Sequence, residues 1–294
     1  MGIPAERIKY TQFYIRQAHL PEHLPHLADE PRLIGVEQFA QRLDALADVA
    51  TLVGIAHVNT FGELLHKVAR ALDIGTTTVV AYLLDGHTGT LLAQSSCQNP
   101  QTQFGADVIS RIQAALRGMQ ERQTDAIREG MTALIRNVCA DAKIDPAQVG
   151  VISVVGNPAM QQLFLGISPE NLAKLPFAPV LTELREVAAK DYIPGLENAK
   201  LLIVPDISGY IGADTMGCVL STQIYNKEEV TLMVDIGTNG EMVLFTGTEH
   251  GGRLYAASAA AGPALEGAGI STGVGGITGA VSSAADVNGQ TENV

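Results

Sequence analysis

The sequence predicts an α/β fold with about two domains, and three observations support this prediction. The chain has 294 residues, and a typical domain has roughly 150. Hydrophobic residues make up 46% of the chain and charged residues 17%, a balance typical of globular proteins and not of disordered chains or coiled coils. From residue 71 onward, strand patterns alternate with helical patterns, which favours a layered α/β architecture.

The first residues differ in character from the rest of the chain. Residues 1–70 are rich in Pro and Leu and contain one helical pattern, over residues 36–49, so we predict a small N-terminal domain there. Residues 71–96 are predicted to form three strands separated by tight turns, because Gly-Thr clusters divide their apolar runs. We therefore assign residues 71–294 to a second, larger domain.

A long helical pair is expected after the three strands. The apolar periodicity extends over residues 106–142 and weakens at Gly118. The residues expected on its buried side in the first half are Val108, Ile109, Ile112, Ala115 and Leu116. Residues 149–155 then indicate a buried strand, with Asn157 as the N-cap and Pro158 as the first residue of the next helix.

The second half of the chain continues the alternation of strands and helices. Residues 172–198 contain three prolines and show no clear period, so we predict a surface crossing. Residues 201–221 indicate a strand, a Gly-rich bend and a helix. Residues 228–247 indicate two strands joined by a tight turn at Asn239-Gly240.

Charge and cysteine content exclude several classes of protein. The formal net charge is −12, from 31 acidic and 19 basic side chains, whereas a protein that binds the nucleic acid backbone needs a basic face. No signal-peptide pattern and no run of about 18 apolar residues occurs, so we expect no membrane association and a cytoplasmic location. Cys97, Cys139 and Cys218 lie far apart, which argues against a disulfide framework and an internal iron–sulfur site.

A repeated turn is the most informative motif. Asp-Ile-Gly-Thr occurs at residues 73–76 and again at residues 235–238, each time at the end of an apolar strand and before a second strand. Backbone N–H groups and Thr hydroxyls of two such turns can hold an anionic ligand, and each Asp can hold a hydrated Mg²⁺ beside phosphates. Such turns also occur in ordinary hairpins, but two copies in matching contexts favour a phosphate site.

This motif selects the candidate site residues. Asp73 and Asp235 are the predicted metal ligands and belong to the predicted catalytic set. Glu241 completes that set because it follows the second turn and could position an attacking water, although a solvated carboxylate is the alternative. The predicted phosphate-binding residues of the two turns are Gly75, Thr76, Thr77, Thr78, Gly237, Thr238, Asn239 and Gly240.

Two further regions carry weaker signals. Gly262-Pro263 suits the start of a helix whose free N–H groups would face nucleotide phosphate, and an ordinary Ala-rich core helix is the alternative. Asp206 and Asp214 flank a Gly-rich bend, where ligand contact and turn or capping roles both stay open. Prolines interrupt the histidines near the N-terminus, which favours a loop over a metal site.

The pair of turns resembles the two phosphate motifs of the superfamily of sugar kinases, acetate kinases, actin and the seventy-kilodalton chaperones, which share two ribonuclease-H-like lobes around a Mg-ATP cleft. Within that superfamily, residues 72–271 are similar to the reductive activators of corrinoid proteins. The stretches that carry this resemblance are DIGTTTVVAYLLD, NPQTQFGADVISRI, VGNPAMQQLFLGI, PFAPV, IVPDISGYIGAD, MVDIGTNGEMVL and AAGPALEGAGIS. The resemblance implies an α/β fold with ribonuclease-H-like, actin and sugar-kinase-type ATPase lobes.

The resemblance also implies a function. Such activators couple ATP hydrolysis to electron transfer that returns a corrinoid from cob(II)amide to cob(I)amide. This implies ATP and Mg²⁺ as cofactors, with a corrinoid protein and an iron–sulfur electron donor as partners; a homodimer is one option for assembly. The alternatives are a small-molecule kinase of the same superfamily and a non-enzymatic, actin-like nucleotide-binding module.

The chain departs from the family pattern in two respects. Family members usually carry an iron–sulfur domain, whereas no cysteine cluster occurs here. They also continue beyond this C-terminus into the rest of the second lobe. We therefore expect the 71–294 ATPase domain to be incomplete at its C-terminus, which leaves the activity of this chain alone open.

The purified chain is predicted to contain no iron–sulfur cluster. Cluster ligation normally takes about four thiolates, and the chain has three cysteines on separate predicted elements. Iron and sulfide analysis together with a visible absorption spectrum provides the measurement. Stoichiometric iron and sulfide bound to the chain would show that the cysteine argument is wrong.

Overall fold

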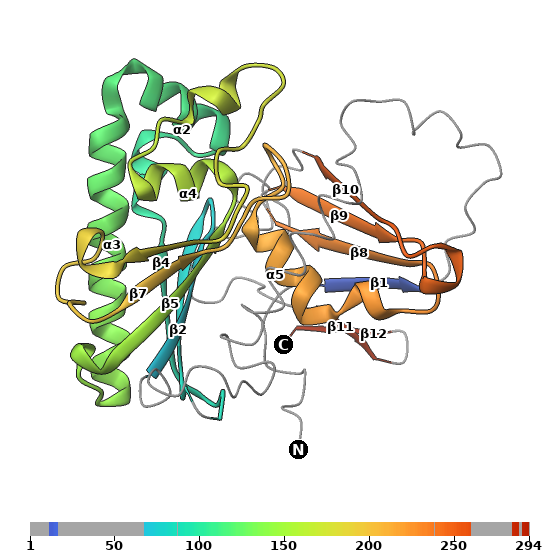
Figure 1. Ribbon diagram of the computed structural model, residues 1–294, viewed down its shortest axis with the longest axis horizontal. Coiled ribbons are helices and arrows are strands. Elements are labelled where there is room, and N and C mark those ends of the chain that lie inside the picture. Colours follow the sequence, from blue (N-terminus) through green and yellow to red (C-terminus); the bar gives the residue numbers. More distant parts are fainter. Residues whose placement is uncertain are drawn as a thin grey trace. The chain divides into compact units, whose positions relative to one another are not determined.

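The computed structural model describes residues 12–16, 68–86, 88–237, 239–259, 284–287 and 290–293 (Figure 1). Contacts divide the chain into two units: residues 34–222 form the larger unit, and residues 1–33 together with 223–294 form the smaller one. Each unit contains its own main β-sheet. The mixed α/β class predicted from the sequence is confirmed by these elements.

The larger unit is built on a six-stranded sheet with the order β4-β3-β2-β5-β7-β6. The central strands β2, β5 and β7 run parallel, and the remaining neighbours pair antiparallel. The bounds are β2 Val68–Ile74, β3 Thr78–Leu84, β4 Leu91–Gln98, β5 Val149–Gly156, β6 Arg185–Ala188 and β7 Lys200–Ile203. The three strands predicted between residues 71 and 96 are therefore confirmed as β2, β3 and β4.

Helices connect and cover this sheet (Figure 1). Their bounds are α2 Val108–Ala114, α3 Gln120–Ala142, α4 Pro158–Leu165 and α5 Ala213–Thr222. Helix α3 packs on β3 and β4 and also contacts α4, while α5 contacts β5. Strand β5 is buried on both faces along much of its length, as expected for a central parallel strand between two layers of helices.

The predicted helical pair over residues 106–142 is confirmed, with its break at Gly118. A π-helical turn, Ala115–Met119, joins α2 to α3, and Gly118 there has a φ of 91°, which glycine adopts without steric cost. The predicted buried side was partly wrong, because Ile109 and Leu116 are 49% and 46% exposed whereas Arg111 is fully buried. The buried side of α2 instead follows residues 108, 111, 112 and 115, the regular spacing of one helical face.

The prediction of a surface crossing over residues 172–198 is also partly wrong. The segment contributes strand β6, which pairs antiparallel with β7 at the edge of the sheet. Five of its apolar side chains are buried in the core, and these are Leu172, Leu181, Ala189, Ile193 and Leu196. None of them lies on β6, and their irregular spacing over loops and 3₁₀ turns matches neither the helical nor the strand period.

The smaller unit contains a four-stranded antiparallel sheet with the order β1-β8-β9-β10. The bounds are β1 Gln12–Arg16, β8 Thr231–Ile236, β9 Gly240–Phe245 and β10 Leu254–Ala259. The predicted hairpin over residues 228–247 is confirmed as β8 and β9. Two further strands, β11 Ala284–Val287 and β12 Gln290–Asn293, pair with each other.

The division expected at residues 70 and 71 stays a prediction, because residues 17–67 lie outside the described part of the chain. Residues 12–16 pair with β8, so this short part of the predicted N-terminal domain shares a sheet with the second repeated turn. Among the helices that the structure describes, none combines the length and the apolar character needed to cross a bilayer.

Candidate functional site

The ends of three neighbouring strands define one edge of the larger sheet. Strands β2, β5 and β7 are parallel and adjacent, so their carboxyl ends lie along the same edge, where α/β proteins bind their ligands. Strand β2 leads into the turn at residues 75–77, β5 into Asn157, and β7 into the Gly-rich bend that begins at Asp206. The first copy of the repeated motif therefore lies at the expected ligand edge.

Hydrogen bonds from the protein interior hold the carbonyl groups of the 75–77 turn. The Asn99 Nδ2 donates to Gly75 O at 2.8 Å, and the Asn99 backbone N–H donates to Thr77 O at 2.8 Å. The Arg111 Nη2 donates to Thr76 O at 2.6 Å. In a trans peptide the next N–H points opposite to the carbonyl. The inward carbonyls therefore direct the Thr76 and Thr77 amides to the other side, as an anion-binding turn requires.

Two residues of the turn are fixed by close packing. A Cβ added to Gly75 would lie 2.5 Å from Thr78 O, so this position accepts only glycine without a shift of the backbone. The Thr76 side chain is buried, and its Oγ1 accepts a hydrogen bond of 3.0 Å from Asn157 Nδ2. Asn157 also caps α4 as predicted, because its Oδ1 accepts from the Met160 N–H. The start of α4 is thereby tied to the turn.

Asp73 lies on β2 just before the turn and is half-buried. It stands opposite Val80 on β3 and Val155 on β5. Burial raises the pKa of Tyr82, and the Asp73 carboxylate raises that pKa further. Asp73 therefore presents its negative charge on the sheet face that it shares with Tyr82, next to the first turn.

The second copy of the motif lies in the smaller unit. Gly237 N–H donates to Asn239 O at 3.0 Å, which closes the tight turn between β8 and β9. A Cβ on Gly237 would lie 3.5 Å from Asn239 O, so here the chain itself does not require glycine. Thr238 and Gly262 lie outside the described residues, and their assigned roles stay predictions.

The strand register brings Asp235 and Glu241 together. They stand directly opposite each other on β8 and β9, and such positions share one face of the sheet. The alternative of a solvated Glu241 is wrong, because this side chain is only 8% exposed and accepts a 3.2 Å hydrogen bond from Ser258 Oγ. Two adjacent carboxylates repel each other, and a bound cation or a shared proton relieves that repulsion.

The Gly-rich bend after β7 packs directly on the backbone at residues 156 and 157, where β5 leads into α4. A Cβ on Gly212 would lie 2.4 Å from Gly156 O, so the two loops touch along their backbones. Asp206 is fully buried, and its backbone N–H donates to Leu181 O. Asp214 Oδ1 accepts a hydrogen bond of 2.7 Å from the Thr215 N–H, which supports the capping role that the sequence left open for Asp214.

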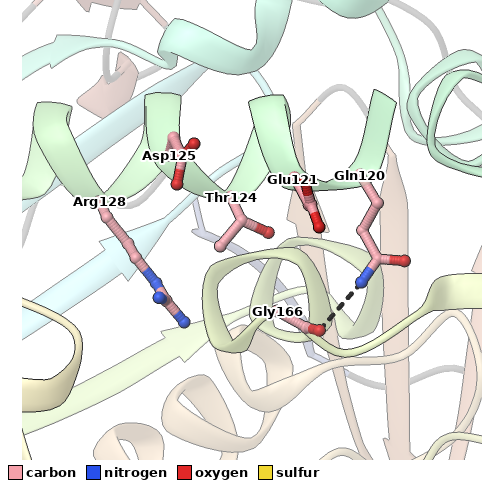
Figure 2. A pocket seen from close by; sticks show the side chains of 6 residues that line it. All are labelled: Gln120, Glu121, Thr124, Asp125, Arg128 and Gly166. Carbon is pink, nitrogen blue, oxygen red and sulfur yellow. Dashed lines mark hydrogen bonds between the residues drawn. The ribbon is translucent and has the colours of Figure 1, made fainter. Parts of the chain in front are cut away.

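A pocket of about 300 Å³ lies between α3 and the end of α4 (Figure 2). Gln120 Nε2 donates to Gly166 O at 2.9 Å, and Thr124 Oγ1 donates to Leu163 O at 2.7 Å. These bonds add side-chain donors to carbonyl groups at the C-terminal end of α4. Gln120 and Thr124 therefore anchor this end of α4 to α3.

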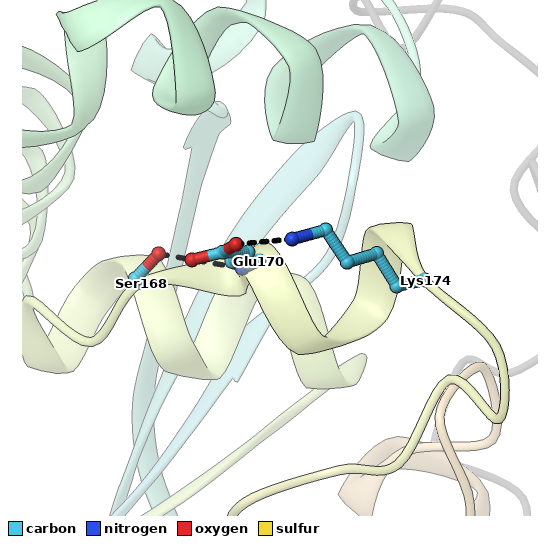
Figure 3. A network of polar contacts seen from close by, with 3 residues as sticks. All are labelled: Ser168, Glu170 and Lys174. Atoms are coloured by element: carbon cyan, nitrogen blue, oxygen red, sulfur yellow. Dashed lines mark hydrogen bonds and ion pairs between the residues drawn. The ribbon is translucent and has the colours of Figure 1, made fainter.

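A second polar cluster surrounds a short 3₁₀ helix at Pro169–Ala173 (Figure 3). Ser168 caps this helix by accepting from the Glu170 N–H at 3.3 Å. Lys174 donates to the Glu170 carboxylate and lowers its pKa. Both side chains of the ion pair are largely exposed, so the pair contributes little to stability and the cluster belongs to a surface turn.

The described residues contain no group of three or more His, Cys, Asp or Glu side chains arranged to hold a metal ion. A magnesium ion needs no such cage, because it is usually bound by one or two carboxylates together with phosphate and water. The three cysteines lie on separate elements, namely Cys97 on β4, Cys139 on α3 and Cys218 on α5.

Sequence reasoning missed Asn99 and Arg111 as parts of the site. Both are fully buried polar residues, and each forms its key hydrogen bond with a segment far away in the sequence. One signal was available for each: Asn99 follows a strand and precedes Pro100, and Arg111 falls on the helical face that continues from Val108. Neither signal identifies the 75–77 turn as the hydrogen-bond partner of these residues.

Comparison with known proteins shows which family this chain belongs to. The description "RACo middle region" matches residues 68–227, and "C-terminal domain of RACo the ASKHA domain" matches residues 229–293. The chain belongs to the RACo family. The resemblance to reductive activators of corrinoid proteins inferred from the sequence is thereby confirmed, as is the actin and sugar-kinase-type ATPase fold.

RACo relatives match most of this chain. It is 37% identical over 223 residues to "Corrinoid activation enzyme RamQ" of Eubacterium limosum, which is 75% of this chain and 37% of the relative. It is 33% identical over 215 residues to "[Co(II) methylated amine-specific corrinoid protein] reductase" of Methanosarcina barkeri, covering 69% of this chain and 38% of that protein. The chain thus spans less than two fifths of the length of these curated relatives.

A solved RACo structure supports the fold directly. The structure described as "Reductive activator for corrinoid,iron-sulfur protein" superposes with a TM-score of 0.66 at 35% sequence identity, covering 71% of this chain and 33% of the other. At this level of similarity the fold is shared.

The two turn glycines are predicted to respond differently to substitution. Gly75→Ala places a Cβ 2.5 Å from Thr78 O and should lower the free energy of unfolding by about 1–3 kcal/mol, as overpacking does. Gly237→Ala meets only an ordinary contact and should change it by less than about 1 kcal/mol. Urea unfolding followed by circular dichroism measures both, and equal losses would contradict the packing described for the first turn.

Proposed function

We propose that this RACo protein takes part in the ATP-dependent reductive activation of a corrinoid protein, from cob(II)amide to cob(I)amide. The observation that carries the proposal is the 75–77 turn, whose carbonyls are bonded to Asn99 and Arg111 in the interior. The names of the two curated relatives, a corrinoid activation enzyme and a corrinoid protein reductase, support the substrate class.

In this proposal the first turn holds nucleotide phosphate. The backbone N–H groups that follow the inward carbonyls donate to phosphate oxygens, and Gly75 lets the main chain approach because it has no Cβ. The hydroxyls of Thr76, Thr77 and Thr78 are further donors. The second turn supplies the corresponding donors of the smaller unit, and these are Gly237, Thr238, Asn239 and Gly240, with Gly262 as a further candidate.

Asp73 and Asp235 would hold Mg²⁺, and the donor set fits this ion. Each carboxylate lies beside a turn with phosphate-binding character, and Mg²⁺ combines one or two carboxylates with phosphate oxygens and water. When bound, the ion would supply positive charge to stabilise the transferring phosphoryl group. Glu241, buried opposite Asp235, would orient the attacking water.

In this proposal the electrons for the corrinoid come from an iron–sulfur cluster that residues 1–294 do not hold. Cys97, Cys139 and Cys218 are separated on three elements, and an iron–sulfur cluster needs about four thiolates. An iron–sulfur protein or domain is therefore the proposed donor. ATP hydrolysis would supply the driving force for this transfer, and the corrinoid protein would be the acceptor.

Corrinoid reduction tests the proposal directly. The full-length protein is mixed with a corrinoid protein in the cob(II)amide state and a low-potential reductant, and the visible spectrum is recorded. Mg-ATP should convert the spectrum to that of cob(I)amide, whereas ADP should not. Hydrolysis of ATP without any change in the corrinoid spectrum would contradict the proposal, and phosphate transfer to sugars or acids would indicate a kinase instead.

Removal of either proposed metal carboxylate should impair ATP hydrolysis. Asp73→Asn and Asp235→Asn are each expected to lower Mg-dependent turnover at least about a hundredfold, because they remove charge that positions the ion. Phosphate release by the full-length protein is the measurement, with and without a chelator. Asp141→Asn, at an exposed position near the end of α3, is the control and should retain wild-type turnover. Full turnover in both site variants would refute the assignment.

A further inference from the structure

Arg111 occupies an unusual place for a charged side chain. It is fully buried on α2, on the same helical face as Val108 and Ile112. Arginine is almost never completely buried in proteins unless its charge is paired. Arg111 therefore carries a positive charge at a position of α2 where the helical period predicts an apolar side chain.

The guanidinium group of Arg111 joins three separate segments. Its Nη2 donates to Thr76 O at 2.6 Å, its Nη1 to Met160 Sδ at 3.0 Å, and its Nε to Gly105 O at 3.0 Å. These segments are the 75–77 turn, α4 and the loop before α2. All three acceptors are uncharged, so these bonds satisfy the donors without neutralising the charge.

The charge of Arg111 is retained at neutral pH. Burial lowers the pKa of Arg111 to about 10, and the negative charge of Asp107 partly opposes this effect. A group with this pKa is still protonated at pH 7. Because burying a charge is costly, a neutral side chain would serve better if this position only had to be filled. The positive charge instead lies against the Thr76 carbonyl of the 75–77 turn.

The local structure around Arg111 aims its side chain at the turn. Asp107 and Ser110 form a capping box that fixes the first turn of α2. A Cβ on Gly105 would lie 2.3 Å from Ser110 Oγ, so glycine is needed for the loop to bring its carbonyl to Arg111. Lysine carries one compact ammonium group and cannot reproduce the planar arrangement of donors.

We propose that Arg111 is a positioning residue for nucleotide phosphate: it holds the Thr76 carbonyl inward, so that the Thr76 and Thr77 amides face the phosphate, and it adds a fixed positive charge behind the turn. This inference rests on the proposed function, because it assigns the anion to ATP. The hydrogen bond by which Arg111 holds the Thr76 carbonyl belongs to the chain itself, and its effect can be measured without nucleotide.

Amide hydrogen exchange tests the hold on the turn. In Arg111→Met without nucleotide, the Thr76 and Thr77 amides should exchange at least about tenfold faster than in the wild type, while amides in α4 should change less. Arg111→Lys should give intermediate rates. Arg128→Met is the matched control, because Arg128 also donates to a backbone carbonyl, Phe164 O, and stacks on the Tyr192 ring away from the turn. It should leave the exchange of the turn unchanged.

Nucleotide affinity tests the consequence for the ligand. Titration of Mg-ATP into the full-length protein should show at least about tenfold weaker binding for Arg111→Met, an intermediate loss for Arg111→Lys, and a change within about twofold for Arg128→Met. The loss should be smaller for Mg-ADP, which carries less charge. Partial recovery by lysine separates a role of the charge from simple loss of packing.

The outcomes separate this inference from the proposed function. Wild-type exchange and wild-type Mg-ATP affinity in Arg111→Met would overturn the role of Arg111. If the wild-type protein does not bind Mg-ATP, the ATPase proposal fails, whereas the exchange measurement still decides whether Arg111 holds the turn. If Arg111→Met does not fold, Arg111→Lys decides: intermediate exchange and affinity support the role, and wild-type values overturn it.

Discussion

The 75–77 turn depends on buried donors that satisfy its three carbonyl groups. A buried carbonyl without a partner would destabilise the fold, so the turn can face its carbonyls inward only where Asn99 and Arg111 reach them. The outward direction of the neighbouring amides follows from the planarity of the peptide group. The direction of the Thr76 and Thr77 amides is thus a consequence of the hydrogen bonds to the carbonyl groups on the opposite side of the turn.

The surrounding elements are arranged so that these donors arrive together. Asn99 follows the end of β4, Arg111 lies on α2, and Asn157 begins α4 while donating to the Thr76 hydroxyl. Helix α4 is in turn anchored at its other end by the side chains of α3 that donate to its carbonyls. The parallel strands bring the start of α4 and the turn to one edge of the sheet.

In the smaller unit, strand register brings the polar side chains of the second candidate turn together. Pairing of β8 with β9 places Asp235 opposite Glu241, and pairing of β9 with β10 places Ser258 opposite Glu241. Burial among apolar side chains such as Met233 and Val243 keeps these polar groups from being fully hydrated. A one-residue shift in register would move the carboxylates to the other face of the sheet, so the site depends on the tight turn at residues 237–240.

The sequence by itself determined the features that depend on near neighbours. The three strands from residue 68 to residue 98, the break at Gly118, the Asn157 cap and the β8–β9 hairpin all follow from short-range patterns. The repeated Asp-Ile-Gly-Thr motif indicated the superfamily, and the stretches around it indicated the family. The tertiary structure decided which polar residues are buried, namely Arg111 in place of Ile109 and Glu241 in place of a solvated carboxylate. It also decided that strand β6 forms within the segment expected to be a surface crossing. The reason is physical, because a polar group can be buried only with a partner. The partners that hold the turn lie 24, 35 and 81 residues away in the sequence, beyond the reach of any local pattern.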